Sequence, residues 1–230
     1  MLNNADVRRA ISGAVDPVAR GLLRIGVSPD AITIFGATVT SVTALVLLPQ
    51  GEFLWALLII GVFAFSDLLD GTMARMRGTS GPWGNFLDST LDRVTDGAIF
   101  AGLLWYGVAE DQTVTALAAA ICLIAGFTIS YSKARAESVG ATANVGIAER
   151  AERLIVAGVG VLLTGLGLEW ALPVFLTILA VLCVITVGQR VLVVRRQLVP
   201  VGGATASPGD GGSATSAKDD DSSDGSATSG

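Results

Sequence analysis

The sequence of 230 residues contains no histidine and only two cysteines. Histidine and cysteine bind the softer metal ions such as Zn²⁺, so their scarcity argues against a centre of that kind. Cys122 and Cys183 each lie inside an apolar run, where we expect small core side chains rather than a disulfide or a metal pair. A metal ion bound by this chain should therefore be a hard cation held by oxygen ligands.

Charged residues are also scarce. They make up 15% of the chain, against 51% hydrophobic residues, and the mean hydropathy is +0.64. A soluble domain usually carries charge on about a quarter of its residues, so this composition indicates an integral membrane protein in contact with membrane lipids. The net charge of −5 gives no reason to expect a nucleic acid partner.

Residues 28–197 hold a succession of apolar segments, and at about 20 residues for each crossing they predict six transmembrane helices. The sixth is expected to end at Gly188-Gln189-Arg190. Residues 1–27 place apolar side chains three and four positions apart with arginines between, which is typical of an amphipathic helix on the membrane surface. The predicted fold class is all-α, an integral membrane protein with six transmembrane helices after an N-terminal amphipathic surface helix.

The basic residues indicate the orientation in the membrane. Lys and Arg lie in the N-terminal helix, at residues 75–84, at residues 133–153 and at the C-terminal end, with Arg93 as the exception. The turns on the other side, which carry none, are at residues 49–52, 110–112 and 168–170. By the positive-inside rule we expect both termini, and the aspartates that flank residues 75–84, on the cytoplasmic side of the plasma membrane.

An acidic motif spans residues 67–92, where two apolar runs meet at a short polar break. If the chain is helical on both sides, residues at i, i+3, i+4 and i+7 share a face. The face before the break then carries Asp67, Asp70, Gly71 and Ala74. The face after it carries Gly84, Asp88 and Asp92. Antiparallel pairing of these helices would bring four carboxylates into one small volume.

Four carboxylates this close cannot all be ionised and unpaired, because like charges raise each other's pKa and membrane burial adds a desolvation penalty. They must hold protons, pair with arginines or bind cations, and oxygen ligands at this density favour Mg²⁺ or Mn²⁺. The alternative is that the aspartates cap helices or pair with Arg75, Arg77 and Arg93. The convergence of all four beside three small residues favours the metal site.

The pattern Asp67-x-x-Asp70-Gly71-x-x-Ala74-Arg75, followed after eight residues by Gly84-x-x-x-Asp88-x-x-x-Asp92, resembles the full signature of the CDP-alcohol phosphatidyltransferase family. The resemblance implies two Mg²⁺ or Mn²⁺ ions on the four aspartates. It also implies transfer of a phosphatidyl group from CDP-diacylglycerol to an alcohol, with Asp92 both a metal ligand and the group that takes the proton from the acceptor hydroxyl.

The same resemblance implies a binding site for CDP-diacylglycerol. Arg75 would contact a phosphate oxygen, and the small Gly71, Ala74 and Gly84 would leave space for a large polar ligand near the backbone. The family often has Pro-Asn-x-x-Thr at the start of the first span. The corresponding residues here are Pro29-Asp30-Ala31-Ile32-Thr33, so Asp30 and Thr33 are candidate nucleotide contacts.

A second polar cluster lies at the expected cytoplasmic ends of the last three spans and contains Lys133, Arg135, Arg150, Arg153 and Arg190. Long basic side chains that reach to lipid headgroups are one explanation, which we prefer for Arg195 and Arg196. For the cluster itself, the interspersed glutamates at positions 137, 149 and 152 favour arginines held in fixed geometry for anion recognition.

Residues 131–137 and 147–153 resemble the corresponding stretches of actinobacterial phosphatidylinositol phosphate synthases within this family. The acceptor in that subfamily is inositol 1-phosphate, and the resemblance assigns its phosphate to Lys133, Arg135, Arg153 and Arg190. Glycerol 3-phosphate is the alternative acceptor, because it is also phosphorylated and would use the same cluster. A homodimer is a further expectation.

Two other protein classes remain as alternatives. Intramembrane prenyltransferases also use paired aspartate motifs with Mg²⁺, but they lack the spacing of Gly71, Ala74, Arg75 and Gly84 and usually have more spans. A transporter with a carboxylate ion site usually breaks its helices at the bilayer midplane, whereas the break here lies at the expected cytoplasmic edge.

Residues 198–230 consist mainly of Gly, Ser, Thr, Ala and Asp and are expected to form a disordered acidic tail. Five aspartates and one lysine give this tail a charge of −4, which leaves −1 for the rest of the chain. Deletion from Ala204 onward should therefore leave the rate of CMP release nearly unchanged. A loss of more than about tenfold, or roughly 1.4 kcal/mol in the barrier, would place the tail in the site.

Overall fold

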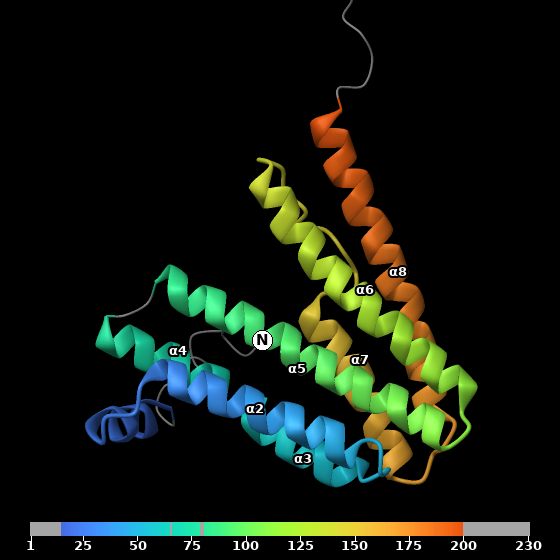
Figure 1. Ribbon diagram of the computed structural model, residues 1–230, viewed down its shortest axis with the longest axis horizontal. Coiled ribbons are helices and arrows are strands. Elements are labelled where there is room, and N and C mark those ends of the chain that lie inside the picture. The colour runs from blue at the N-terminus through green and yellow to red at the C-terminus, as the bar shows by residue number, and fades with distance from the viewer. Residues whose placement is uncertain (1–14, 65, 79–80, 200–230) are drawn as a thin grey trace, which may run out of the picture. The chain divides into compact units, whose positions relative to one another are not determined.

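The computed structural model describes residues 15–64, 66–78 and 81–199, and for residues 66–68 it describes the backbone alone. Over these ranges all regular structure is helical, which confirms the predicted all-α class (Figure 1). After a helix over residues 15–24 come α2 (Pro29–Leu47), α3 (Phe53–Ala64), α4 (Ser66–Arg77), α5 (Pro82–Ala109), α6 (Thr113–Ser138), α7 (Arg150–Gly165) and α8 (Ala171–Leu198).

Four helical stretches of the described chain are long and apolar enough to cross a membrane, namely Pro29–Leu47, Phe53–Arg77, Thr113–Ser138 and Ala171–Leu198. The second combines α3 and α4. Helix α5 carries several charged residues in its N-terminal part, and α7 has only 16 residues and begins with charged ones. The chain is therefore a multi-pass membrane protein by helix length and composition.

Several predicted turns agree with the structure. The three turns without basic residues connect α2 to α3, α5 to α6 and α7 to α8, as expected. Helix α8 continues without a break beyond Gly188-Gln189-Arg190, the predicted end of the sixth span, to Leu198. Its last turns have partners: Val194 packs on Ala141 and Ala143, and the Gln197 side chain hydrogen-bonds the backbone of Thr142.

Residues 1–14 and 200–230 lie outside the described residues, so the first half of the predicted surface helix and nearly all of the predicted tail are not described. The part of the surface helix that is described, residues 15–24, is helical as expected. Its first half, the tail and their boundaries stay predictions.

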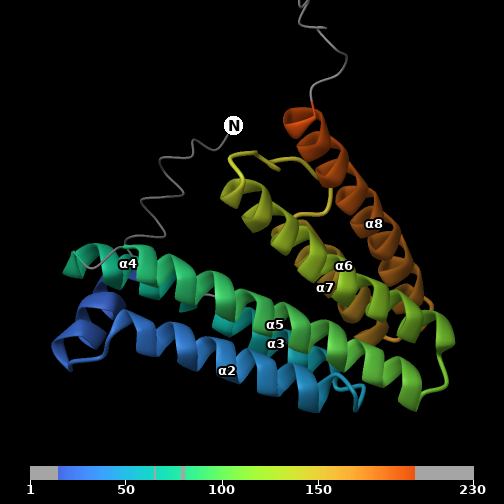
Figure 2. The same cartoon turned by 45° about the horizontal axis from the view of Figure 1, so that its top comes forward.

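Helices α5, α6 and α8 supply the centre of the core. Helix α6 packs against both α5 and α8, α2 packs against α5, α3 and α4, and α7 packs against α8 and α3 (Figures 1 and 2). The side chains of Phe100 and Leu103 on α5, and of Leu172, Leu176 and Leu179 on α8, are almost completely buried. Helices α5 and α7 are not a closely packed pair, so their backbones lie apart.

Two glycines of α5 allow neighbouring backbones to approach closely. A Cβ atom on Gly102 would lie 2.3 Å from the carbonyl oxygen of Ala44 in α2, and one on Gly107 would lie 2.5 Å from the backbone nitrogen of Ala116 in α6. Since no methyl group fits at these distances, the packing of α5 against both neighbours depends on glycine at these positions.

Substitution Gly102→Ala should therefore lower thermal stability by about 2 kcal/mol, the usual cost of overpacking, or roughly 4–8 °C for a chain of this size. The measurement is thermal unfolding of the purified protein in detergent. The matched control is Gly61→Ala in α3, where an added Cβ meets nothing within 4 Å. Equal melting temperatures for the two variants would contradict the close approach of α2 and α5.

Candidate active site

The acidic motif occupies two helices, as predicted. Helix α4 ends at Arg77 and is followed by Gly78, which has a φ of +67°, and α5 begins with Pro82 in its first turn. Asp70 on α4 is 9% exposed and accepts a hydrogen bond from the Thr33 hydroxyl of α2. The side chain of Asp67 lies outside the described residues, and its backbone precedes Asp70 by about one helical turn in α4.

A polar cavity of about 630 Å³ lies between α2, α4 and the start of α5. The predicted site residues that line it are Asp30, Thr33, Asp70, Gly71, Ala74, Arg75, Gly84 and Asp88. The cavity thus brings together most of the acidic motif and both residues predicted from the start of the first span. Because four of the lining residues, namely Gly71, Ala74, Gly81 and Gly84, are glycine or alanine, this space stays open beside the carboxylates.

Two side-chain contacts involve residues that line this polar cavity. The indole nitrogen of Trp83, at the start of α5, donates a hydrogen bond of 2.9 Å to Asp30 on α2, and the Trp83 ring stacks on Phe86. The Arg75 guanidinium donates to the Thr72 hydroxyl of its own helix at 2.9 Å. Asp30 therefore holds the first turn of α5 against the first turn of α2.

An apolar cavity of about 510 Å³ adjoins the polar one and lies between α2, α3, α5 and α7. Most of its lining is aliphatic, with Leu57, Ile60 and Leu154 among the contributors. The residues that line both cavities are Thr33, Asp88 and Arg150. Asp92 lines the apolar cavity rather than the polar one. The acidic motif therefore lies where a polar space and an apolar space meet.

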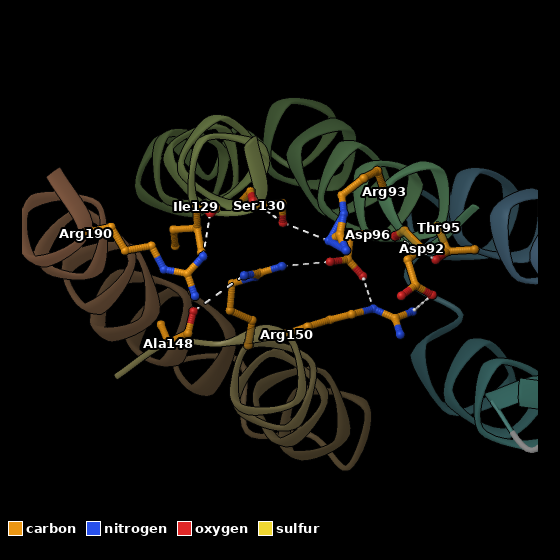
Figure 3. A network of polar contacts seen from close by, with 11 residues as sticks. Asp92, Arg93, Thr95, Asp96, Ile129, Ser130, Ala148, Arg150 and Arg190 are labelled. Atoms are coloured by element: carbon orange, nitrogen blue, oxygen red, sulfur yellow. Dashed lines mark hydrogen bonds and ion pairs between the residues drawn. The ribbon is translucent and has the colours of Figure 1, made fainter. Parts of the chain in front are cut away.

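A network of ion pairs connects α5 to α7 (Figure 3). Arg150 binds Asp92 at 2.7 Å through a terminal nitrogen and Asp96 at 3.3 Å through Nε. Arg153 binds the other oxygen of Asp96 at 2.8 Å, and its side chain is only 1% exposed. Since α5 and α7 are not a closely packed pair, long arginine side chains make this connection.

Arg190 of α8 fixes the loop between α6 and α7. It donates hydrogen bonds of 2.9 Å to the carbonyl of Val145 and 2.6 Å to that of Ile129, and its remaining nitrogen lies 3.5 Å from Glu149. Thr186, one turn earlier on α8, accepts hydrogen bonds from the backbone nitrogens of residues 147 and 148. These contacts set the position at which α7 begins, and with it the position of Arg150.

The predicted acceptor cluster is divided in the structure. Arg153 and Arg190 are buried, and protein oxygens accept hydrogen bonds from both. Lys133 and Arg135 are exposed near the end of α6, where Arg135 donates to Ser138. None of these four residues lines either of the two described cavities. Their assignment to the acceptor phosphate stays a prediction.

The sequence reasoning did not identify Asp96 as part of this site. Asp96 is 7% exposed and its two carboxylate oxygens hold Arg150 and Arg153. A pattern for it was present, because Asp88, Asp92 and Asp96 follow one another at steps of four on one face of α5. The family motif ends at Asp92, so Asp96 was not among the predicted site residues.

The described carboxylates suit a hard cation by their chemistry. Asp70 and Asp88 line the same polar cavity, Asp92 follows Asp88 by one turn, and no histidine or cysteine is near to favour a softer metal. Among the side chains that the structure describes, no group of three such ligands is close enough to hold a metal ion. Asp67, which would complete the set, is outside that description.

Comparison with known proteins gives consistent results. The model of the CDP-alcohol phosphatidyltransferase family matches residues 26–187. A phosphatidylinositol phosphate synthase from Streptomyces avermitilis is 44% identical over 211 residues, which cover 88% of this chain and 86% of that protein. One from Mycobacterium tuberculosis is 42% identical over 193 residues, covering 80% and 86%.

Crystal structures of the Mycobacterium tuberculosis enzyme are similar in fold. The structure with bound CDP-DAG matches with a TM-score of 0.74 at 42% identity, over 78% of this chain and 92% of that one. The complex with manganese and citrate matches with a TM-score of 0.75, over 78% and 88%. Since the family match spans well over half of the 230 residues, the chain belongs to the CDP-alcohol phosphatidyltransferase family.

Proposed function

We propose that this protein transfers the phosphatidyl group of CDP-diacylglycerol to inositol 1-phosphate, which yields phosphatidylinositol phosphate and CMP. The observation that carries the proposal is the polar cavity that contains most of the acidic motif and adjoins an apolar cavity between the helices. A lipid with a nucleotide headgroup requires both environments side by side. The two relatives described above, both named phosphatidylinositol phosphate synthases, support the choice of acceptor.

The two cavities suggest how the donor would bind. Its cytidine and pyrophosphate would occupy the polar cavity, where Gly71, Ala74 and Gly84 leave room and Arg75 offers a guanidinium to a phosphate oxygen. Asp30 and Thr33 lie on the wall of the same space. An acyl chain would enter the adjoining apolar cavity. The related crystal structure with CDP-DAG bound supports a donor site in this fold.

Asp67, Asp70, Asp88 and Asp92 would hold two Mg²⁺ or Mn²⁺ ions, in agreement with the related structure that contains manganese. Bound ions would neutralise the pyrophosphate and stabilise the charge that develops on it. Asp92 would take the proton from the acceptor hydroxyl, and Arg150, 2.7 Å away, orients that carboxylate. The acceptor oxygen forms the new bond to the phosphatidyl phosphorus, and the bond from that phosphorus to CMP breaks.

The acceptor phosphate would be held by Lys133, Arg135, Arg153 and Arg190. A dianion needs charge-assisted hydrogen bonds to lie stably near a pyrophosphate, and arginines already fixed by protein contacts supply them with little loss of conformational freedom. Arg153 and Arg190 are fixed in this way, whereas Lys133 and Arg135 are exposed. A neutral acceptor would need no such cluster.

The membrane arrangement proposed here has six crossings, because α5 and α7 are included with the four apolar stretches. Their charges do not forbid this, since Asp92 and Asp96 pair with Arg150 and Arg153. Helix α5, with 28 residues, is about 42 Å long, and α7, with 16 residues, is about 24 Å long. Both termini and the site would face the cytoplasm at the plasma membrane, and the protein would act as a homodimer.

Activity should require a divalent cation and all four aspartates. EDTA should abolish CMP release, and added Mg²⁺ or Mn²⁺ should restore it. We expect kcat to fall by about hundredfold or more in each of the variants Asp67→Asn, Asp70→Asn, Asp88→Asn and Asp92→Asn. Loss of a residue that only hydrogen-bonds a metal ligand already lowers metal affinity or activity by about 10- to 100-fold, and loss of a ligand itself should cost at least as much. The control is Asp111→Asn, an exposed turn residue with a φ of 55°, which asparagine also tolerates. Full activity in EDTA or in two of the four variants would exclude the two-metal mechanism.

Lys133→Ala and Arg153→Gln should raise the KM for inositol 1-phosphate by about tenfold or more, since a hydrogen bond to a charged group contributes roughly 1.5–3 kcal/mol. The KM for CDP-diacylglycerol should change far less. Arg196→Gln, an exposed arginine on the last turn of α8, is the matched control and should behave as wild type. Faster use of glycerol 3-phosphate than of inositol 1-phosphate by the wild type would overturn the proposed acceptor. Equal use of free inositol would overturn the anion site.

A further inference from the structure

We propose that Asp96, which follows the acidic motif by one helical turn, is a positioning residue that aligns Arg150 and Arg153 for the acceptor phosphate. The proposal rests on the proposed function, because it concerns the acceptor side of that reaction. Asp96 would not touch the substrate. It would act through the two arginines that it holds.

The geometry at Asp96 is that of a carboxylate fully used by two partners. Its Oδ1 lies 3.3 Å from Nε of Arg150 (Figure 3). Its Oδ2 lies 2.8 Å from a terminal nitrogen of Arg153. The two arginines are three residues apart in the first turn of α7. One carboxylate therefore sets the direction of two guanidinium groups on the neighbouring helix.

Asp96 is the main contact that fixes the Arg153 head group. Besides Asp96, Arg153 donates to the carbonyl of Ala148 at 3.4 Å, and its buried Nε has no hydrogen-bond partner among the described residues. Gly126 on α6 faces this side chain, and a Cβ there would lie 3.5 Å from the Nε. Without Asp96, the buried guanidinium would lose its counter-charge and its shortest hydrogen bond.

Arg150 connects this anchor to the acidic motif. Its guanidinium reaches Asp96 with Nε and Asp92 with a terminal nitrogen, and it lines both cavities. Asp92 and Asp96 thus place two carboxylates against the guanidinium groups of Arg150 and Arg153. When Asp92 serves the acceptor hydroxyl, Asp96 remains the carboxylate that keeps Arg150 in place.

A purely structural role fits these observations less well. Replacing a buried ion pair by apolar residues of similar volume is often neutral or stabilising, so stability alone does not call for this network. Helices α5 and α7 are also not a closely packed pair, so Asp96 orients side chains more than it joins backbones. The two roles differ in which KM changes. If Asp96 positions the arginines, its loss should raise the KM for the acceptor alone, whereas a structural role would change the KM for both substrates.

The experiment compares Asp96→Asn with wild type and with Asp111→Asn, measuring kinetics for both substrates and thermal unfolding in detergent. We expect the KM for inositol 1-phosphate to rise at least about tenfold, with the KM for CDP-diacylglycerol within about twofold. Asp111→Asn should match wild type. Asp96→Glu keeps the charge but moves the carboxylate by one methylene, so it should raise the KM for inositol 1-phosphate less, and again without a similar rise for CDP-diacylglycerol. This variant replaces Asp96→Asn if the latter yields little folded protein.

A double-mutant cycle with Arg153→Gln tests whether Asp96 acts through its partner. If it does, the double variant should have a KM for inositol 1-phosphate close to that of Arg153→Gln alone, whereas independent residues would multiply their effects. An unchanged acceptor KM in both Asp96 variants, an equal rise for both substrates, or multiplicative effects would each overturn the proposal. Failure of the wild type to use inositol 1-phosphate would overturn the proposed function instead, and Asp96 would then be judged with glycerol 3-phosphate by the same criteria.

Discussion

Charges within an apolar environment must be neutralised, and this constraint organises the structure around α5. Asp92 and Asp96 lie on one face of that helix, and Arg150 and Arg153 of α7 reach them at 2.7–3.3 Å. Because long side chains make the connection, α5 and α7 can remain apart, and a cavity of about 510 Å³ lies between them and their neighbours. The arginine side chains that neutralise the aspartates of α5 thus also leave the space between α5 and α7 in which an apolar ligand could lie.

Small residues serve two opposite purposes in the same helices. Gly102 and Gly107 let α5 pack so closely on α2 and α6 that a methyl group would collide with backbone atoms. Gly71 and Gly84, by contrast, line an open cavity, and a Cβ on Gly84 would meet nothing within 4 Å. Close packing at Gly102 therefore fixes the relative position of α2 and α5, and the opposite ends of these two helices line the polar cavity. A site formed by side chains from α2, α4, α5 and α7 depends on that fixed position.

The sequence predicted the features that follow from local spacing. The helical faces of the motif, the turns without basic residues and the gathering of Asp70, Gly71 and Asp88 around one space all depend on helical periodicity and chain reversal. Partner choice between distant helices has no such periodicity. The pairing of Asp96 with Arg153, 57 residues later, was therefore not predicted, and neither was the division of the basic cluster into buried and exposed members. The turns of α8 beyond the predicted end of the span were also not predicted as helix, because their support comes from Thr142 and Ala143 in a remote loop.

The charge balance at α5 and α7 has a consequence for substrate recognition in the proposed reaction. Since Asp92 and Asp96 pair with Arg150 and Arg153, those two arginines by themselves offer little excess positive charge for a phosphate dianion. Arg190 and the exposed Lys133 and Arg135 would have to add to it, and a water-soluble acceptor would first meet the cations at the surface. The lipid donor would instead approach through the apolar cavity. The two routes would converge beside Asp88 and Arg150, which line both cavities. The aspartates that would hold the metal ions for the reaction therefore lie where donor and acceptor would meet.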